Sequence, residues 1–84
     1  MIYKIRRKSD GHILASDSLS FIPNNGKNKG KRFKTEKGAI KKIAFITLTD
    51  EIGQDGLPDF YIKGHIENYG SLDPNDFELL KEEE

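Results

Sequence analysis

The fold is anchored by a stretch that runs from Ile2 to Ser16 and reads IYKIRRKSDGHILAS. Apolar and polar side chains alternate around Tyr3 and Ile5, as they do in a half-buried strand. Lys8-Ser9-Asp10-Gly11 has the composition of a tight turn, because Asp-Gly tolerates positive φ. His12–Ser16 then reads as the returning strand. The stretch therefore predicts an N-terminal β-hairpin.

Two more short strands are predicted before residue 35. Leu19–Ile22 has the composition of a strand, and Pro23 ends it because proline cannot donate a hydrogen bond to a sheet. Residues 23–30 are rich in Gly, Asn and Pro and predict a loop. Lys31–Lys34 predicts another short strand, with Phe33 turned toward the core.

A central helix is predicted from Glu36 to about Leu48. Thr35 is a good N-cap residue. By composition alone, Ile43–Thr49 fits a strand as well. The helix is preferred because the cap is present and because Lys41 and Lys42 then share one outer face. Apolar and small residues also recur at near-helical spacing, namely Ala39, Ile40, Ile43, Ala44, Ile46 and Thr47.

The C-terminal third predicts one more strand and a short helix. Residues 53–59 predict a loop, and Phe60–Tyr69 alternates as a strand in which Gly64 marks a bulge or a close backbone contact. Asp73 and Pro74 predict the start of a short C-terminal helix that docks Phe77 and Leu80. The acidic tail at 81–84 is expected to fray.

Together these elements predict one α+β domain spanning residues 1–84. Its small, mainly antiparallel sheet of three or four strands packs on the central helix, with the short helix at the C-terminus. The chain has 84 residues, so its core is thin and each large apolar side chain matters. The predicted core consists of Tyr3, Ile5, Ile13, Phe33, Ile40, Ile43, Ile62 and Ile66.

Composition excludes several classes of function. The chain has no cysteine, which excludes disulfides, thiolate zinc sites and cysteine nucleophiles. It has no apolar run of about 18 residues and no secretory signal, so a cytoplasmic protein without membrane contact is expected. His12 and His65 lack the spacing of metal ligands, and no serine lies in a nucleophile motif. We expect no catalytic residues, no metal and no cofactor.

The zero net charge conceals a strong asymmetry along the chain. Residues 1–42 hold 12 basic and 3 acidic residues, whereas residues 43–84 hold 2 basic and 11 acidic ones. Such a layout predicts an anionic partner for the basic half or an acidic segment that competes for the same surface. Pairing of opposite halves in a homodimer is an alternative. The predicted basic face consists of Lys4, Arg6, Lys8, Lys27, Lys29, Lys31 and Arg32, with Lys34 beside them.

The glycine-flanked part of this face is unlike a nucleotide-binding loop. Three residues separate Gly26 from Gly30, and Arg32 follows Lys31, where a phosphate-binding loop needs four residues and then Lys-Ser or Lys-Thr. A nucleic acid backbone requires no such fixed geometry, because lysine and arginine gain affinity by releasing counterions. A nucleic-acid-binding module is therefore the alternative function.

A second candidate surface lies on the predicted last strand, where side chains of interface-forming types point to one side. An edge strand also invites a partner to pair with it. This surface consists of Tyr61, Lys63, His65 and Tyr69.

Four short parts of the chain carry a resemblance, namely the run from Tyr3 to Gly11, Gly30-Lys31, Phe33 and residues 38–43, which read GAIKKI. In these parts the chain resembles a group of small uncharacterised bacteriophage proteins. The resemblance covers roughly the first half of the chain. It implies a phage accessory protein and offers no catalytic residues.

A second resemblance, to the arm-binding domains of tyrosine recombinases, rests on the spacing of Phe33, Thr35 and Ala39. No recombinase catalytic domain follows it here. Taken with the phage resemblance, the expected function is that of a non-enzymatic accessory protein that binds and modulates a host macromolecule. A host protein is favoured over nucleic acid, because the acidic half repels nucleic acid at long range outside the basic face.

Overall fold

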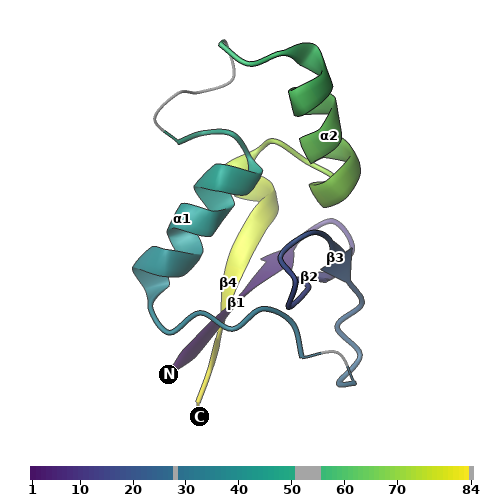
Figure 1. Cartoon of the computed structure of the whole chain (residues 1–84). Coiled ribbons are helices and arrows are strands. Elements are labelled where there is room, and N and C mark those ends of the chain that lie inside the picture. Colours follow the sequence, from purple (N-terminus) through teal and green to yellow (C-terminus); the bar gives the residue numbers. More distant parts are fainter. Residues whose placement is uncertain (28, 51–55, 84) are drawn as a thin grey trace.

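The computed structural model describes residues 1–27, 29–50 and 56–83, and it confirms the predicted α+β class (Figure 1). Four antiparallel strands form one sheet in the order β3-β2-β1-β4. Within the described residues, no helix combines the length and apolar character that crossing a membrane requires. The elements are β1 (Ile2–Arg7), β2 (Ile13–Leu14), β3 (Phe21–Ile22), α1 (Glu36–Ile46), α2 (Asp59–Tyr69), a 3₁₀ turn (Pro74–Asp76) and β4 (Phe77–Glu82).

The predicted N-terminal hairpin is confirmed. β1 and β2 pair in antiparallel fashion, with Arg6 opposite Ile13. The Arg7 N–H donates to the His12 carbonyl over 2.7 Å at the mouth of the turn. Gly11 adopts a φ of +73°, a left-handed conformation that glycine reaches at little steric cost. Local sequence alone therefore fixes the start of the sheet.

The hairpin turn is also held by an ion pair between Arg7 and Asp10. The Arg7 Nη2 lies 2.6 Å from Asp10 Oδ2, and Nε lies 3.1 Å from Oδ1. Hydrogen bonding from Arg7, helped by the His12 backbone N–H and opposed by partial burial, lowers the pKa of Asp10 from its usual 3.8 to about 2. The folded state thus favours the ionised form of Asp10 over the protonated form. Its contribution to stability is complete above about pH 4 and is lost as the pH falls toward about 2.

Replacing Asp10 by Asn should flatten this acid-induced loss of stability. In the wild-type chain, protonation of Asp10 should lower the free energy of unfolding by about 1 kcal/mol between about pH 5 and pH 2. The value is below that implied by the full pKa shift, because the Asp10 side chain is 36% exposed and solvent screens the pair. Urea unfolding at a series of pH values measures it, with Asp17→Asn as the control. Equal acid loss in Asp10→Asn and wild type would contradict the assignment.

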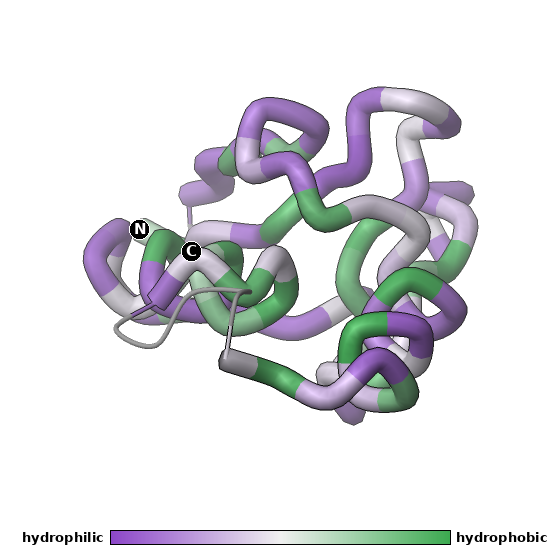
Figure 2. The backbone as a smooth tube through the Cα atoms, turned by 90° about the horizontal axis from the view of Figure 1, so that it is seen from above, coloured by the Kyte–Doolittle hydropathy of each residue, from purple (hydrophilic) through white to green (hydrophobic). Residues whose placement is uncertain are grey.

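β1 occupies the centre of the sheet because the two ends of the chain pair. The register runs from Ile2 opposite Glu82 to Arg7 opposite Phe77. Figures 1 and 2 accordingly show the N- and C-termini side by side. The acidic end of the chain is therefore joined directly to its basic beginning.

Two of the predicted short strands are present in reduced form. The predicted strand Leu19–Ile22 is limited to β3, which pairs with β2. The predicted strand Lys31–Lys34 is reduced to one bridge, in which Tyr3 and Phe33 exchange two backbone hydrogen bonds of 2.8 Å. Phe33 packs against the core, as predicted.

Helix α1 is close to its prediction. The Thr35 hydroxyl accepts a hydrogen bond from the Gly38 N–H over 3.1 Å, which confirms the N-cap. The helix ends at Ile46 rather than Leu48, because Leu48 turns to a φ of +57°. The Thr49 N–H then donates to the Ala44 carbonyl over 2.9 Å, the closing bond of a Schellman motif. Glycine is the usual residue in this left-handed conformation. Here Leu48 adopts it, and the Leu48 side chain is buried.

The prediction of a strand over Phe60–Tyr69 is wrong, because these residues belong to helix α2. The alternation that indicates a strand coexists here with a helical period. Tyr61, His65 and Tyr69 recur every four residues and therefore share one helix face. A run this short fits both periods, and packing against α1 decides between them.

Signals at both ends of α2 mark it as a helix. Asp59 stands in the first turn, where a negative charge suits the helix dipole. Gly70 ends the helix with a φ of +87°. A Cβ on Gly64 would meet nothing within 4 Å among the described residues, so the predicted bulge or close contact at Gly64 is also wrong. Of the predicted loop at 53–59, residues 53–55 lie outside the described residues, and Asp59 is the first residue of α2.

The predicted C-terminal helix is present as the single 3₁₀ turn Pro74–Asp76. Asp73 caps it as predicted, and its side chain accepts from the Asn75 N–H over 2.9 Å. Phe77 is buried, as predicted, but it begins β4 instead of extending a helix.

The predicted frayed tail is in part wrong as well. Lys81 and Glu82 belong to β4, where they pair with Tyr3 and Ile2. Glu84 lies outside the described residues. Pairing with β1 orders these residues in spite of their charge.

The core lies between α1 and the sheet. Of the predicted core residues, Ile5 and Ile13 are completely buried, and Tyr3, Phe33 and Ile43 are partly buried. Tyr69 and Phe77 join the core from the C-terminal half. The central cluster consists of Ile5, Leu14, Ala39, Ile46, Tyr69 and Phe77.

Two core predictions are wrong. Ile40 is 52% exposed and Ile66 is 46% exposed, while Ile62 is half-buried. α1 turns Ala39 toward the sheet, and Ile40 lies about 100° further around the helix and faces outward. Ile66 loses its inward position because it lies on a helix instead of the predicted strand.

Candidate binding surfaces

The basic side chains of β1 do not form a free surface. Lys4 Nζ lies 3.2 Å from Glu82 Oε2, and Arg6 Nη1 lies 2.6 Å from Glu78 Oε1. Both acidic partners stand on β4, since antiparallel pairing places the acidic end of the chain beside β1. The separation of basic and acidic residues along the sequence therefore does not extend to this strand pair, where the two signs lie next to each other. Lys8 is exposed on the hairpin turn.

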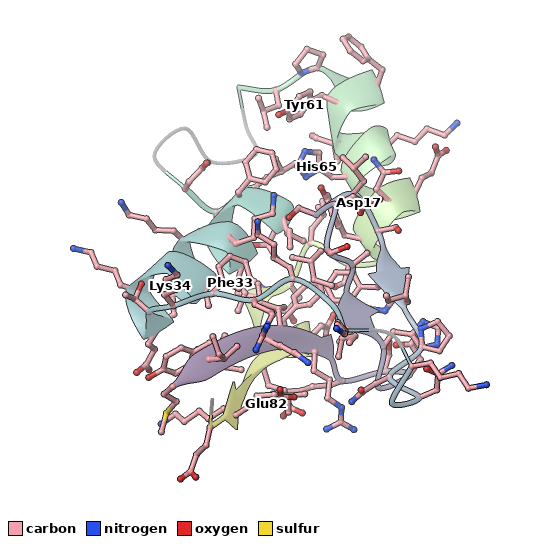
Figure 3. The ribbon with its side chains drawn as sticks, turned by 60° about the horizontal axis from the view of Figure 1, so that its bottom comes forward. Asp17, Phe33, Lys34, Tyr61, His65 and Glu82 are labelled. Carbon is pink, nitrogen blue, oxygen red and sulfur yellow. The ribbon has the colours of Figure 1, made fainter. Side chains whose placement is uncertain are left out.

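A different part of the predicted basic face is not neutralised by ion pairs among the described residues. Lys27–Lys42, which we call the basic segment, leads from the loop after β3 into α1 and contains a single acidic residue, Glu36. Among the residues that the structure describes, no ion pair joins a carboxylate to any lysine or arginine of this segment. Figure 3 shows Phe33 and Lys34 where the segment enters α1. The basic side chains are Lys27, Lys29, Lys31, Arg32, Lys34, Lys37, Lys41 and Lys42.

Lys31 and Lys42 are half-buried, whereas the other six basic side chains of the segment are exposed. Lys42 Nζ lies 4.5 Å from the centre of the Phe45 ring, a cation–π contact. Partial burial lowers the pKa of Lys42 below its usual 10.5, and the positive charge of Lys31 lowers it further. Lys42 thus rests on an aromatic ring while the like charge of Lys31 acts on it.

An aromatic row joins α1 to α2 next to these lysines. The ring of His65 lies 5.3 Å from that of Phe45, 4.9 Å from Tyr61 and 5.4 Å from Tyr69, measured between centres. Figure 3 shows Tyr61 and His65 close together on α2. Phe45 and Tyr61 are each 39% exposed and form the accessible part of the row.

The prediction that His65 and Tyr69 are exposed contact residues is wrong. Both are buried, because their helix face packs toward α1 and β3. The Nδ1 of His65 lies 3.0 Å from the Ile46 carbonyl, which only accepts, so Nδ1 carries a proton and donates. The Tyr69 hydroxyl donates to the Ser18 carbonyl over 3.0 Å, and burial raises the pKa of Tyr69. These two residues hold α2 in place.

The outer face of α2 carries apolar side chains in solvent. Phe60 is 77% exposed and Ile66 is 46% exposed, with the exposed Lys63 between them. The three residues follow at intervals of three and are therefore neighbours on the helix surface. Tyr61 adjoins Phe60 on the side toward α1. Of the predicted protein-contact residues, Tyr61 and Lys63 are thus accessible.

A pocket of about 470 Å³ lies beside the hairpin turn and is lined in part by Arg6, His12, Asn24 and Leu80. Arg6 is already bound to Glu78, and His12 Nδ1 lies 3.5 Å from the Asp10 carboxylate that Arg7 holds. The described residues contain no group of three or more His, Asp or Glu side chains that would hold a metal ion. The described residues that line it include no serine or threonine that could serve as a nucleophile beside His12.

Phe45 and Phe60 are exposed aromatic residues that neither of the surfaces predicted from the sequence includes. Phe45 stands three residues after Lys42 and four after Lys41, so the predicted helix already places it on their outer face. Phe60 alternates in step with the predicted core residues Ile62 and Ile66, so a strand over Phe60–Tyr69 would turn it inward. Comparisons with protein-family models, with curated proteins and with solved structures found no match to this chain.

Proposed function

We propose that this chain is a non-enzymatic binding protein that docks a partner protein on the outer face of α2. The observation that supports this most is Phe60, an aromatic side chain that is 77% exposed beside Ile66 and Lys63. Aromatic side chains are enriched at protein interfaces, where burying one ring contributes a large share of the binding energy. On a helix, such side chains present one continuous contact stripe.

The proposed setting follows from the resemblance of the first half of the chain to phage accessory proteins. The partner is then a host protein that the chain inhibits or redirects in the cytoplasm of an infected bacterium. Tyr61 and Lys63 are proposed as contact residues beside Phe60. No cofactor is proposed.

A pull-down with matched variants tests this proposal. Tagged wild-type chain is incubated with nuclease-treated bacterial lysate, in parallel with Phe60→Asp and Ile40→Asp. Ile40 is 52% exposed on α1, so both variants place a charge on an exposed apolar residue. We expect wild type and Ile40→Asp to retain one protein in stoichiometric amount and Phe60→Asp to lose it, because a carboxylate in an apolar contact is costly to desolvate.

Two results would contradict the proposal. One is the absence of any stoichiometric partner, or its equal capture by Phe60→Asp. The other is a solution mass of two chains that Phe60→Asp returns to one. In that case the outer face of α2 binds a second copy of this chain, and the partner is not a host protein.

A further inference from the structure

The basic segment and the accessible part of the aromatic row meet on one surface. On α1, Lys37, Lys41 and Phe45 follow at intervals of four residues and form one row along the helix. Lys42 stands beside this row with its ammonium over the Phe45 ring, and the charge of Lys31 in the preceding loop helps to lower the pKa of Lys42. The Tyr61 ring contacts the same His65 ring that Phe45 contacts.

We infer that this surface binds single-stranded nucleic acid, with the lysines on the phosphates and Phe45 as a stacking platform for a base. The inference is separate from the proposed function, because it uses α1 and the preceding loop instead of the outer face of α2.

Charge is the first support for this inference. A lysine held in a structural ion pair has little to gain from a phosphate, whereas the basic segment has no carboxylate partner among the described residues. The zero net charge of the whole chain matters less than this local excess. Charges further apart than about 8–10 Å are largely screened at physiological salt.

Residue type is the second support. Lysine is depleted at protein interfaces, so a surface with this many lysines fits a polyanion better than a protein. An exposed aromatic ring among lysines adds what a bare charged patch lacks, since every base has a face that stacks. The row from Lys37 to Phe45 is about 12 Å long at 1.5 Å per residue. That length accommodates about three phosphates of a stacked strand at roughly 3.4 Å each.

The contact between Lys42 and Phe45 links the two parts of the site. In the free protein the ammonium rests on the ring face at 4.5 Å, near the repelling charge of Lys31. A phosphate placed between Lys31 and Lys42 relieves this repulsion and draws the Lys42 ammonium off the ring. The uncovered face of Phe45 then becomes available to a base.

The primary test is fluorescence anisotropy of a labelled oligothymidylate of about 15 nucleotides, titrated with the full chain at several salt concentrations. We expect micromolar binding at low salt. The logarithm of the affinity should fall with the logarithm of the salt concentration at a slope of about −2, the value for about three phosphate contacts on a single strand. No anisotropy change at about 20 mM salt overturns the inference.

A charge-matched pair of variants locates the phosphate contacts. The double variant Lys31→Gln with Lys42→Gln should bind about tenfold more weakly at low salt, with a slope closer to zero by about 1.4. The control is Lys8→Gln with Lys81→Gln, which removes the same charge from the exposed hairpin turn and from β4. The control should stay within about twofold of wild type. Equal weakening in both double variants overturns the inference, because net charge alone then explains binding.

Stacking is tested without altering the protein. An abasic oligonucleotide of the same length keeps the phosphates and lacks the bases, and it should bind at least about fivefold more weakly than oligothymidylate. Phe45→Leu should remove this difference, while Phe45→Tyr should keep it. Equal affinity of the abasic and thymidine strands for wild-type chain overturns the stacking role.

Two competitors separate nucleic acid from other polyanions. Polyglutamate of matched charge and a duplex of matched length are titrated against the bound oligothymidylate. Each should compete at least about fivefold more weakly than unlabelled oligothymidylate. Stronger competition by polyglutamate would show that the surface fits an acidic protein, and stronger competition by duplex would contradict single-strand binding.

Discussion

Gly30→Ala should lower the free energy of unfolding by about 3 kcal/mol or more, through left-handed backbone strain and a steric clash together. Gly30 has a φ of +71°, and a Cβ placed on it would lie 2.8 Å from Ile13 Cδ1 and 3.0 Å from the Leu14 carbonyl oxygen. Ile13 is completely buried, so its side chain has no space into which to move. The Leu14 oxygen is held as well, since it accepts the Lys31 N–H over 2.8 Å.

Gly26 offers a matched control in the same loop. Its φ is +81°, and a Cβ there would meet nothing within 4 Å among the described residues. Gly26→Ala therefore carries the backbone strain without the clash and should cost about 1 kcal/mol. Urea unfolding of both variants measures the difference. Equal costs at the two positions would contradict the close packing of the loop on β2.

The parts of the fold that sequence predicts well depend on neighbouring residues. The Asp10-Gly11 turn and the Thr35 cap each act within a few residues, and both are present as expected. They fix the hairpin and α1, because a turn or a cap needs no partner distant in the sequence. The α+β class follows from these two elements.

The parts that sequence misses depend on distant partners. β4 is a strand because it pairs with β1, whose partner residues stand 70 to 80 positions earlier in the chain. Its residues read FELLKE and carry no turn or cap signal that announces a strand. In α2, alternation and the four-residue period compete, and the contacts of His65 with Phe45 and with the Ile46 carbonyl favour the helix. Tertiary contacts thus override local pattern at both places.

The candidate surfaces follow the same division. Sequence identifies the basic residues, since a count of charges needs no fold. It cannot separate Lys4 and Arg6, which β4 neutralises, from Lys31, which has no such partner among the described residues. The burial of His65 and Tyr69 also depends on the fold. Each residue of the predicted surfaces whose assignment changed contacts β4 or lies on α2, the two elements that differ from their predicted form.

Phe77→Ala should be the most damaging of the core substitutions, with a cost of about 3–5 kcal/mol. Phe77 is 5% exposed and lies in the central cluster, with its ring centre 5.4 Å from that of Phe21 on β3. It is also the first residue of β4, opposite Arg7. Removing the ring leaves a cavity where the C-terminal strand joins the rest of the core. A domain of this size has about 5–10 kcal/mol of stability in total, so much of the chain should be unfolded at moderate temperature.

Phe60→Ala makes the same chemical change at a side chain that is 77% exposed, and it should cost less than about 0.5 kcal/mol. Thermal unfolding followed by circular dichroism compares the two variants with wild type under identical conditions. If β4 were a dispensable acidic tail, the two substitutions would have the same small effect. A large cost for Phe77→Ala alone means that the acidic end of the chain is bound into the core through Phe77.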